Sequence, residues 1–194
     1  MDYPGGVNAD AIRAVLLNDV EGVSSAYVYE NDTDAHDDTY NLPPHSLEAV
    51  VYGGLDEEIA KAIYSRRSGG VQTIGSVSVN VVTASKQQLA IRFSRPTPKK
   101  IWIKISKLKK NSSYAGDDTI REALVEYIGS STAGGLEIGI DVIYIKLPGI
   151  VAAVSGVEDF DIDISTDGIT YGKSNVSIGY REKAITEESA VIIE

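Results

Sequence analysis

The chain has 194 residues, 43% of them hydrophobic, and carries a formal net charge of −10 at pH 7. That length allows one large or two small domains with a real hydrophobic core. The absence of cysteine excludes disulfides and thiolate sites. The absence of cysteine also fits a reducing cytoplasm. No apolar run reaches membrane-spanning length and no basic-then-apolar leader begins the sequence, so we expect neither a membrane span nor a signal peptide.

The charges are arranged in blocks along the chain. Residues 1–60 carry 13 acids and 1 base, residues 61–110 carry 12 bases and no acid, and residues 111–194 carry 15 acids and 5 bases. Two interpretations follow. Strands from different blocks lie side by side and neutralise one another within a monomer, or the blocks form complementary surfaces that meet between subunits and orient the contact.

The first segment predicts a helix followed by a strand. Residues 1–6 are expected to be a flexible lead-in. From Asn8 the apolar residues recur at helical spacing, with Asn8 or Asp10 available as N-cap and Gly22 as the stop. Residues 23–30 then alternate as a strand, and the polar, acidic residues 31–41 are expected to form a surface loop.

Residues 42–96 form the stretch around which the rest is organised, and they read as strand, helix, strand, strand. A strand is expected over residues 45–52. After two glycines, residues 55–67 place Leu55, Ile59, Ala62 and Ile63 on one helix face, with acids in the first turn and arginines in the last. Residues 77–83 and 89–93 then predict a β-hairpin.

The second half begins at a proline-containing boundary. Pro96 and Pro98 lack the N–H donor that a strand ladder needs, so a domain boundary is placed there. We expect a half-buried strand over 99–109, a helix over 118–128 capped by Asp117, a short helix over 151–155 after a bent piece containing Pro148, and a strand over 157–165 paired with 175–180. The predicted fold class is α+β: two small modules, residues 1–96 and 97–194, of helices packed on mixed or antiparallel sheets.

A local pattern recurs on both sides of this boundary. The segments AVLLNDVEGVSSAYVYENDT and GIVAAVSGVEDFDIDISTD both read as helix, Gly-Val, strand and acidic turn. The recurrence indicates two related modules of about ninety residues each, although one repeated pattern is not a repeat array.

Four short motifs in the central stretch carry a resemblance. They are the PPHS strand, the GG-acidic-acidic-IA-AI helix, the G-x-x-T-x-G turn and the I-x-FSRP strand, in this order. Together they resemble the baseplate J family of tailed-phage and prophage tail proteins, and the chain resembles the C-terminal half of those longer proteins. The resemblance implies a structural wedge or ring component of the virion tail baseplate, assembled in the host cytoplasm, which contacts other tail proteins and its own copies and is not an enzyme.

Catalytic and metal-binding patterns are weak. His36 and His45 are the only histidines, and the acidic residues between Glu30 and Asp38 lack the glycine and final glutamate of an EF-hand loop. The run from Asp163 to Gly168 resembles the opening of a calcium loop, but a hairpin turn explains the same residues. No phosphate-binding loop or nucleophile elbow is present. We therefore predict no catalytic residue, no metal ligand and no cofactor.

The basic strand offers the best candidate interaction residues. These are Arg95, Lys99, Lys100, Trp102, Lys104 and Lys107. Because the whole chain carries ten excess negative charges, nucleic acid is not an expected partner, and neither is a membrane. An alternative function stays open: a small acidic binding or enzyme-accessory module that holds a divalent cation.

Overall fold

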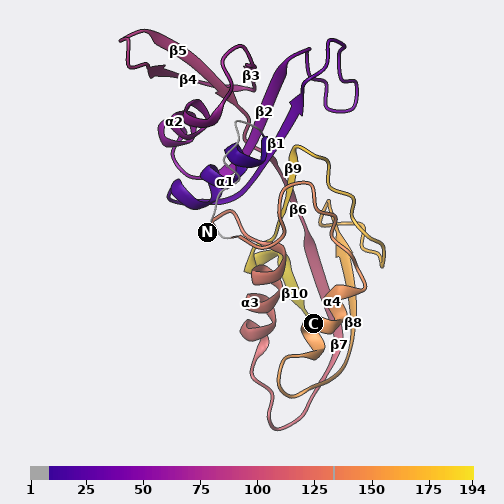
Figure 1. Cartoon of the computed structure of the whole chain (residues 1–194). Helices are drawn as coiled ribbons and strands as arrows, with labels where there is room; N and C mark the ends of the chain where they lie inside the picture. The colour runs from indigo at the N-terminus through magenta and orange to yellow at the C-terminus, as the bar shows by residue number, and fades with distance from the viewer. Residues whose placement is uncertain (1–8, 133) are drawn as a thin grey trace. The chain divides into compact units, whose positions relative to one another are not determined.

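The computed structural model describes residues 9–132 and 134–194 (Figure 1). The predicted lead-in over residues 1–6 and the possible cap at Asn8 lie outside the described residues. The chain divides into two compact units, Met1–Pro96 and Thr97–Glu194, called unit 1 and unit 2 below. Independent folding of these units as domains stays a prediction.

Residues 9–96, the described part of unit 1, form two helices and five strands. In chain order they are α1 (Ala9–Asp19), β1 (Val23–Asn31), β2 (Ser46–Gly53), α2 (Asp56–Arg66), β3 (Gln72–Ile74), β4 (Val77–Val82) and β5 (Gln88–Phe93). The central strand β2 pairs antiparallel with β1 and parallel with β3, while β4 and β5 form the predicted hairpin.

The core of unit 1 lies where the two helices and the hairpin pack on the sheet. Ile12 and Leu16 of α1, Ile59 and Ile63 of α2, and Phe93 of β5 are buried in one cluster. The helical spacing seen in the sequence therefore marks the buried faces, with one error. Leu55 is the N-cap of α2 and is 72% exposed, because the helix begins one residue later than its periodicity suggests.

Unit 2 has the following elements in chain order: β6 (Thr97–Lys100), β7 (Trp102–Lys110), α3 (Asp117–Ile128), α4 (Lys146–Ala152), β8 (Val157–Ser165), β9 (Glu182–Ile185), the short 3-10 helix η1 (Glu188–Ala190) and β10 (Val191–Ile193). Strand β7 lies between β10 and β8, and β6 pairs with β9. Ile103 and Ile105 of β7 are buried with Ile120 and Leu124 of α3. The predicted α+β class, with helices packed on mixed and antiparallel sheets, is confirmed.

The two three-stranded sheets share one arrangement. In each, the central strand pairs antiparallel with one neighbour and parallel with the other: β2 with β1 and β3, and β7 with β8 and β10. In each, the antiparallel neighbour follows a helix and a glycine with positive φ, Gly22 at +79° and Gly156 at +80°. The local pattern that recurs in the sequence thus recurs in structure.

Pro98 lies inside a strand, so the prediction that the prolines stop any ladder is wrong at this position. Among the described strands, β6 pairs with β9 alone, and its flanking N–H groups donate to that side: Thr97 to the carbonyl oxygen of Arg181, just before β9, and Ile101 to that of Ile185. Alternate amides of a strand point to opposite sides, so the nitrogen of Pro98 faces the unpaired edge, where its missing hydrogen costs no bond. The predicted strand over 99–109 is accordingly two strands, which meet at Ile101.

Three further predictions in unit 2 are corrected. The short helix begins at Lys146, not at residue 151, because Pro148 lies in its first turn, where an N–H group has no helical partner. Asp117 is the first residue of α3 and Gly116 is its N-cap. Residues 175–180 do not pair with β8; that strand pairs with β7, and Val176 makes only an isolated bridge with Val142.

Within residues 9–132 and 134–194, none of the helices combines the length and the apolar character needed to cross a lipid bilayer.

Candidate functional site

The motif residues of unit 1 converge on one side chain, Arg95. Its Nη1 donates to the carbonyl oxygens of Val51, at 3.1 Å, and of Gly53. Its Nη2 donates to the carbonyl oxygen of Gly54, at 2.8 Å, and to the carboxylate of Asp56. The planar guanidinium fork therefore joins the end of β2 to the first turn of α2. This explains why the double glycine and the FSRP segment occur together.

A second set of bonds ties the remaining motifs together. Ser94 donates its hydroxyl to the buried carboxylate of Glu48 at 2.6 Å, and its oxygen accepts the N–H of Ser76 at 3.3 Å. The N–H of Arg92 donates to the hydroxyl of Thr73 at 3.0 Å. Every one of these bonds lies within unit 1. The motifs thus form a structural junction, and their side chains are occupied with holding strands and a helix in place.

Five of the six lysines of β6 and β7 form ion pairs with acids of their own unit. The shortest nitrogen–oxygen distances are 3.1 Å for Lys99–Glu182, 2.8 Å for Lys104–Glu194, 2.7 Å for Lys107–Asp161, 2.7 Å for Lys109–Asp159 and 2.9 Å for Lys110–Asp117. The antiparallel register of β7 and β8 brings the basic strand beside the acidic one. This arrangement favours local neutralisation over complementary intersubunit surfaces as the reason for these charge blocks.

These pairs change the proton affinities of both partners. The hydrogen bond from Lys109 lowers the pKa of Asp159, and the hydrogen bond from Lys107 lowers the pKa of Asp161. In return, the same bonds raise the pKa values of Lys107 and Lys109, and the bond to Glu194 raises the pKa of Lys104. The charged forms of both strands are therefore favoured in the folded state.

The ion pairs between β7 and β8 should therefore stabilise unit 2 most between about pH 5 and pH 10. The lowered aspartate pKa values stabilise the fold above their ordinary value of 3.8, and this contribution is lost as the pH falls through the folded-state values. The raised lysine pKa values stabilise it below 10.5, and this contribution is lost as the pH rises through the folded-state values. Melting followed by the fluorescence of Trp102 tests this. A melting temperature that stays unchanged down to pH 3 would contradict it.

Trp102 and Lys100 also contact their own unit. The Nζ of Lys100 lies 5.0 Å from the centre of the indole ring. Gly168, with φ at +73°, lies so close to the ring that a Cβ there would come within 3.2 Å of it. Trp102 is half-buried in this turn. Of the six predicted interaction residues, the structure thus places Arg95 in the junction of unit 1 and the other five on β6 and β7.

The polar residues considered as metal ligands are engaged in local contacts. The ring of His45 lies 2.8 Å from Asp34, and that of His36 lies 3.1 Å from Asn41. Asp167 accepts bonds within its own turn, which lower its pKa. No group of three or more histidine, cysteine or acidic side chains suited to a metal occurs in the described part of the chain.

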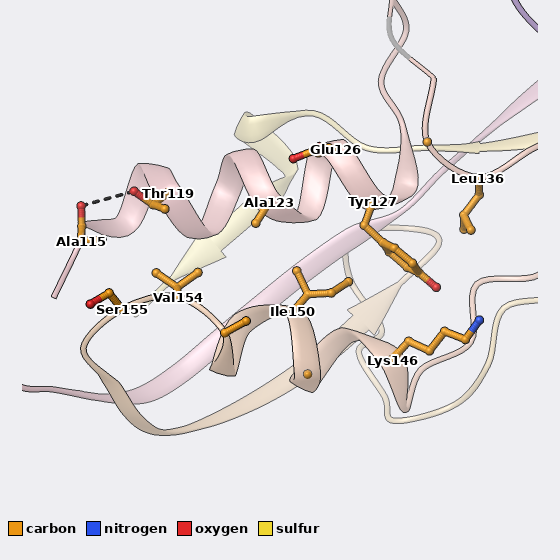
Figure 2. A pocket seen from close by; sticks show the side chains of 13 residues that line it. Ala115, Thr119, Ala123, Glu126, Tyr127, Leu136, Lys146, Ile150, Val154 and Ser155 are labelled. Carbon is orange, nitrogen blue, oxygen red and sulfur yellow. Dashed lines mark hydrogen bonds between the residues drawn. The ribbon is translucent and has the colours of Figure 1, made fainter.

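A groove between α3 and α4 was not predicted (Figure 2). Its volume is about 980 Å³, and its walls carry small residues: Thr119 and Ala123 on α3, and Gly149 and Ala153 at α4. The ring of Tyr127 lies at one end. The buried hydroxyl of Tyr127 has no hydrogen-bond partner among the described residues, and burial raises its pKa. The sequence did not predict this groove, because the short helix that forms one wall was expected over residues 151–155, whereas α4 begins at Lys146.

A buried lysine was missed as well. Lys183 of β9 has no exposed surface, and its Nζ donates to the carbonyl oxygens of Gly134, at 2.8 Å, and Leu136, at 2.6 Å. Burial lowers its pKa. The side chain fastens the segment after α3 to β9. No sequence signal distinguishes this lysine from the exposed ones, since its environment depends on the non-local pairing of β9.

Comparison with known proteins gives a structural neighbour. No protein-family model matches the chain, and no curated protein matches it. Among solved structures, it is similar to a chain of the "Cryo-EM structure of the anti-feeding prophage (AFP) baseplate, 6-fold symmetrised", with a TM-score of 0.50 and 14% identity. The match covers 91% of this chain and 36% of that one. The fold is baseplate-like. This chain spans little more than a third of that neighbour's length, and at this identity the similarity establishes the fold alone.

Proposed function

We propose that the chain is a structural component of a phage or prophage tail baseplate, of the baseplate J-like kind, that works through subunit contacts and catalyses no reaction. The observation that carries the proposal is the fold match over 91% of the chain to a component of a prophage baseplate. The four sequence motifs support it independently. They resemble the baseplate J family. In the structure Arg95 of the FSRP strand bonds to the double glycine and the helix after it. The PPHS strand and the G-x-x-T-x-G turn bond to the FSRP strand through Glu48 and Thr73.

The proposed partners are other baseplate or tail proteins and further copies of the chain in a ring. The proposed location is the tail baseplate of the virion, with assembly in the host cytoplasm. Since the chain corresponds to only 36% of the matched baseplate chain, contacts made by the rest of that protein are not transferred to it.

Immunogold electron microscopy tests the location. An antibody raised against the purified chain should label tail particles from the producing cells at the end that carries the baseplate. Labelling along the tail tube would contradict the proposal. So would the absence of labelling on particles in which an immunoblot detects the chain. A signal that disappears after the antibody is absorbed with purified chain provides the control.

The proposed interaction residues remain Arg95, Lys99, Lys100, Trp102, Lys104 and Lys107. Lys107 has the most exposed ion pair among them, with 80% of its side chain accessible. An exposed pair contributes only about 0–1 kcal/mol, so Lys107 can exchange Asp161 for a carboxylate on a partner at little cost. Such contacts orient two subunits, while the half-buried Trp102 supplies apolar area.

A charge exchange separates this role from local neutralisation. Asp161 also pairs with Lys173, at 3.5 Å. The triple variant Lys107→Glu/Asp161→Lys/Lys173→Glu therefore keeps both ion pairs inside unit 2 but reverses the charge offered to a partner at each position. If Lys107 contacts a partner, this variant should weaken the salt-sensitive association, measured by sedimentation at low and high salt, while the melting temperature stays near that of the natural chain. Unchanged association would show that the pair acts only within the fold.

A further inference from the structure

Strand β4 of the hairpin has an open edge. It pairs with β5 on one side, in a register that places Asn80 opposite Ala90. No other strand pairs with residues 77–82 within the described chain. In Figure 1 the hairpin lies beside α2 as a two-stranded ribbon.

The register identifies which backbone groups face this open edge. The N–H of Thr83 donates to the carbonyl oxygen of Gln87 across the hairpin. Because bonded and non-bonded pairs alternate along an antiparallel ladder, Val81, Val79 and Val77 also direct their backbone groups to β5. Those of Ser78, Asn80 and Val82 point outward and are available to another strand.

This edge lacks the features that keep other edges from pairing. Natural proteins protect edge strands with charges, prolines or covering side chains. Here β6 carries Pro98 and lysines, β8 carries aspartates, and Arg13 of α1 bonds to the carbonyl oxygen of Ala26 in β1. Strand β4 reads VSVNVV, with no charge and no proline, and Val82 at its end is 64% exposed.

A groove runs along the same edge. It has a volume of about 490 Å³ and is lined by the consecutive residues 79–82 and by Glu57, Lys61 and Tyr64 of α2. Val77, Val79 and Val81 are the more buried residues of β4, whereas Ser78 and Asn80 are exposed. A strand added to β4 would thus place alternate side chains in the groove, against α2, and the others in solvent.

We propose that a second copy of the chain occupies this edge, with the two β4 strands antiparallel and Asn80 on the twofold axis. A twofold contact uses one patch twice, so the patch must be complementary to itself. In this register Val79 lies opposite Val81 of the other copy, apolar against apolar on the face toward α2. The outward N–H and carbonyl groups of Asn80 bond to those of its counterpart, and those of Ser78 to Val82.

Charge also favours a second copy as the occupant. The strand itself carries no charge that would repel its own image. The α2 wall of the groove offers one carboxylate, Glu57, and one ammonium, Lys61, which already pairs with Glu58. Two identical walls brought together therefore present both signs to each other. This contact goes beyond the proposed baseplate role and does not rest on it, since it depends on β4 and not on the lysines of β7.

Sedimentation velocity of the full-length chain over a concentration series tests the proposal. The natural chain should form a dimer whose dissociation constant changes little with salt, because the pairing strand is uncharged. Asn80→Lys and Asn80→Asp should each weaken this dimer about tenfold or more, since like charges would face each other across the axis. An equimolar mixture of the two variants should restore a dimer, because it places opposite charges there.

Ala90→Lys is the matched control. Ala90 is exposed, lies opposite Asn80 on the same face of the hairpin and is not on the open edge. It should leave the dimer intact. Thermal melting of each variant shows whether it folds, which is expected because both positions face solvent. A natural chain that stays monomeric, a dimer that persists in both Asn80 variants, or a mixture that fails to dimerise although each variant folds would overturn the proposal.

Discussion

Replacing Ile63 with alanine should lower the free energy of unfolding of unit 1 by about 2–5 kcal/mol. Ile63 has no exposed surface and packs in the cluster formed by both helices, β2 and the hairpin. Removing its branched side chain leaves a cavity that the surrounding strands can fill only in part. Denaturant unfolding followed by far-ultraviolet circular dichroism measures the change. A loss below about 0.5 kcal/mol would mean that this helix face is not core.

The same variant tests whether the units unfold separately. The only tryptophan of the sequence, Trp102, lies in unit 2, so its fluorescence reports on that unit alone. If the units are independent domains, Ile63→Ala leaves the fluorescence transition in place, and Leu124→Ala in α3 shifts it. Leu124 is an equally buried control for unit 2. A fluorescence transition that moves with Ile63→Ala would contradict independent folding.

Replacing Arg95 with alanine should destabilise unit 1 by about 2–4 kcal/mol, because the carbonyl oxygens of Val51, Gly53 and Gly54 lose a charged donor. Arg95→Lys should recover less than half of this loss, since an ammonium cannot reproduce the planar fork. Urea unfolding followed by circular dichroism measures both. The control is Arg92→Ala, an exposed position on β5, which should change stability by less than about 0.5 kcal/mol.

Equal stability of the Arg95→Lys variant and the natural chain would show that charge alone, supplied next to Asp56, is what the junction needs. If Arg95→Ala is neutral as well, the motif residues are not held together by this side chain, and their clustering needs another explanation.

Elements with strong local signals could be predicted from the sequence. The helices α2 and α3 and the hairpin of β4 and β5 each have apolar residues at a regular spacing and a glycine or turn at their ends. Strands β6, β9 and β10 have four residues or fewer, and their partners lie far away in the chain. Nothing local distinguishes them from loops, so the parallel pairings of unit 2 were missed.

The candidate surfaces show the same limit. The lysines of β7 stand out by charge alone, but whether they face a partner protein or Asp159 and Asp161 depends on the register between two strands. The contacts of Arg95 could not be predicted for a related reason. As a member of a basic block it resembles a surface residue, and its hydrogen bonds to the double glycine become visible only in the folded chain.

The pairing of β7 with β10 bears on the order in which the chain can fold during synthesis. Every strand and helix of unit 1 has been made once Pro96 has left the ribosome, so that unit can close while translation continues. In unit 2, by contrast, β6 and β7 must wait for β9 and β10, which are synthesised much later. Until β10 has been made, the isoleucines of β7 lack some of the residues that bury them in the folded chain, such as Val191. If unit 1 folds independently, a chaperone that binds the incompletely paired strands of a nascent chain would therefore stay on unit 2 longer than on unit 1.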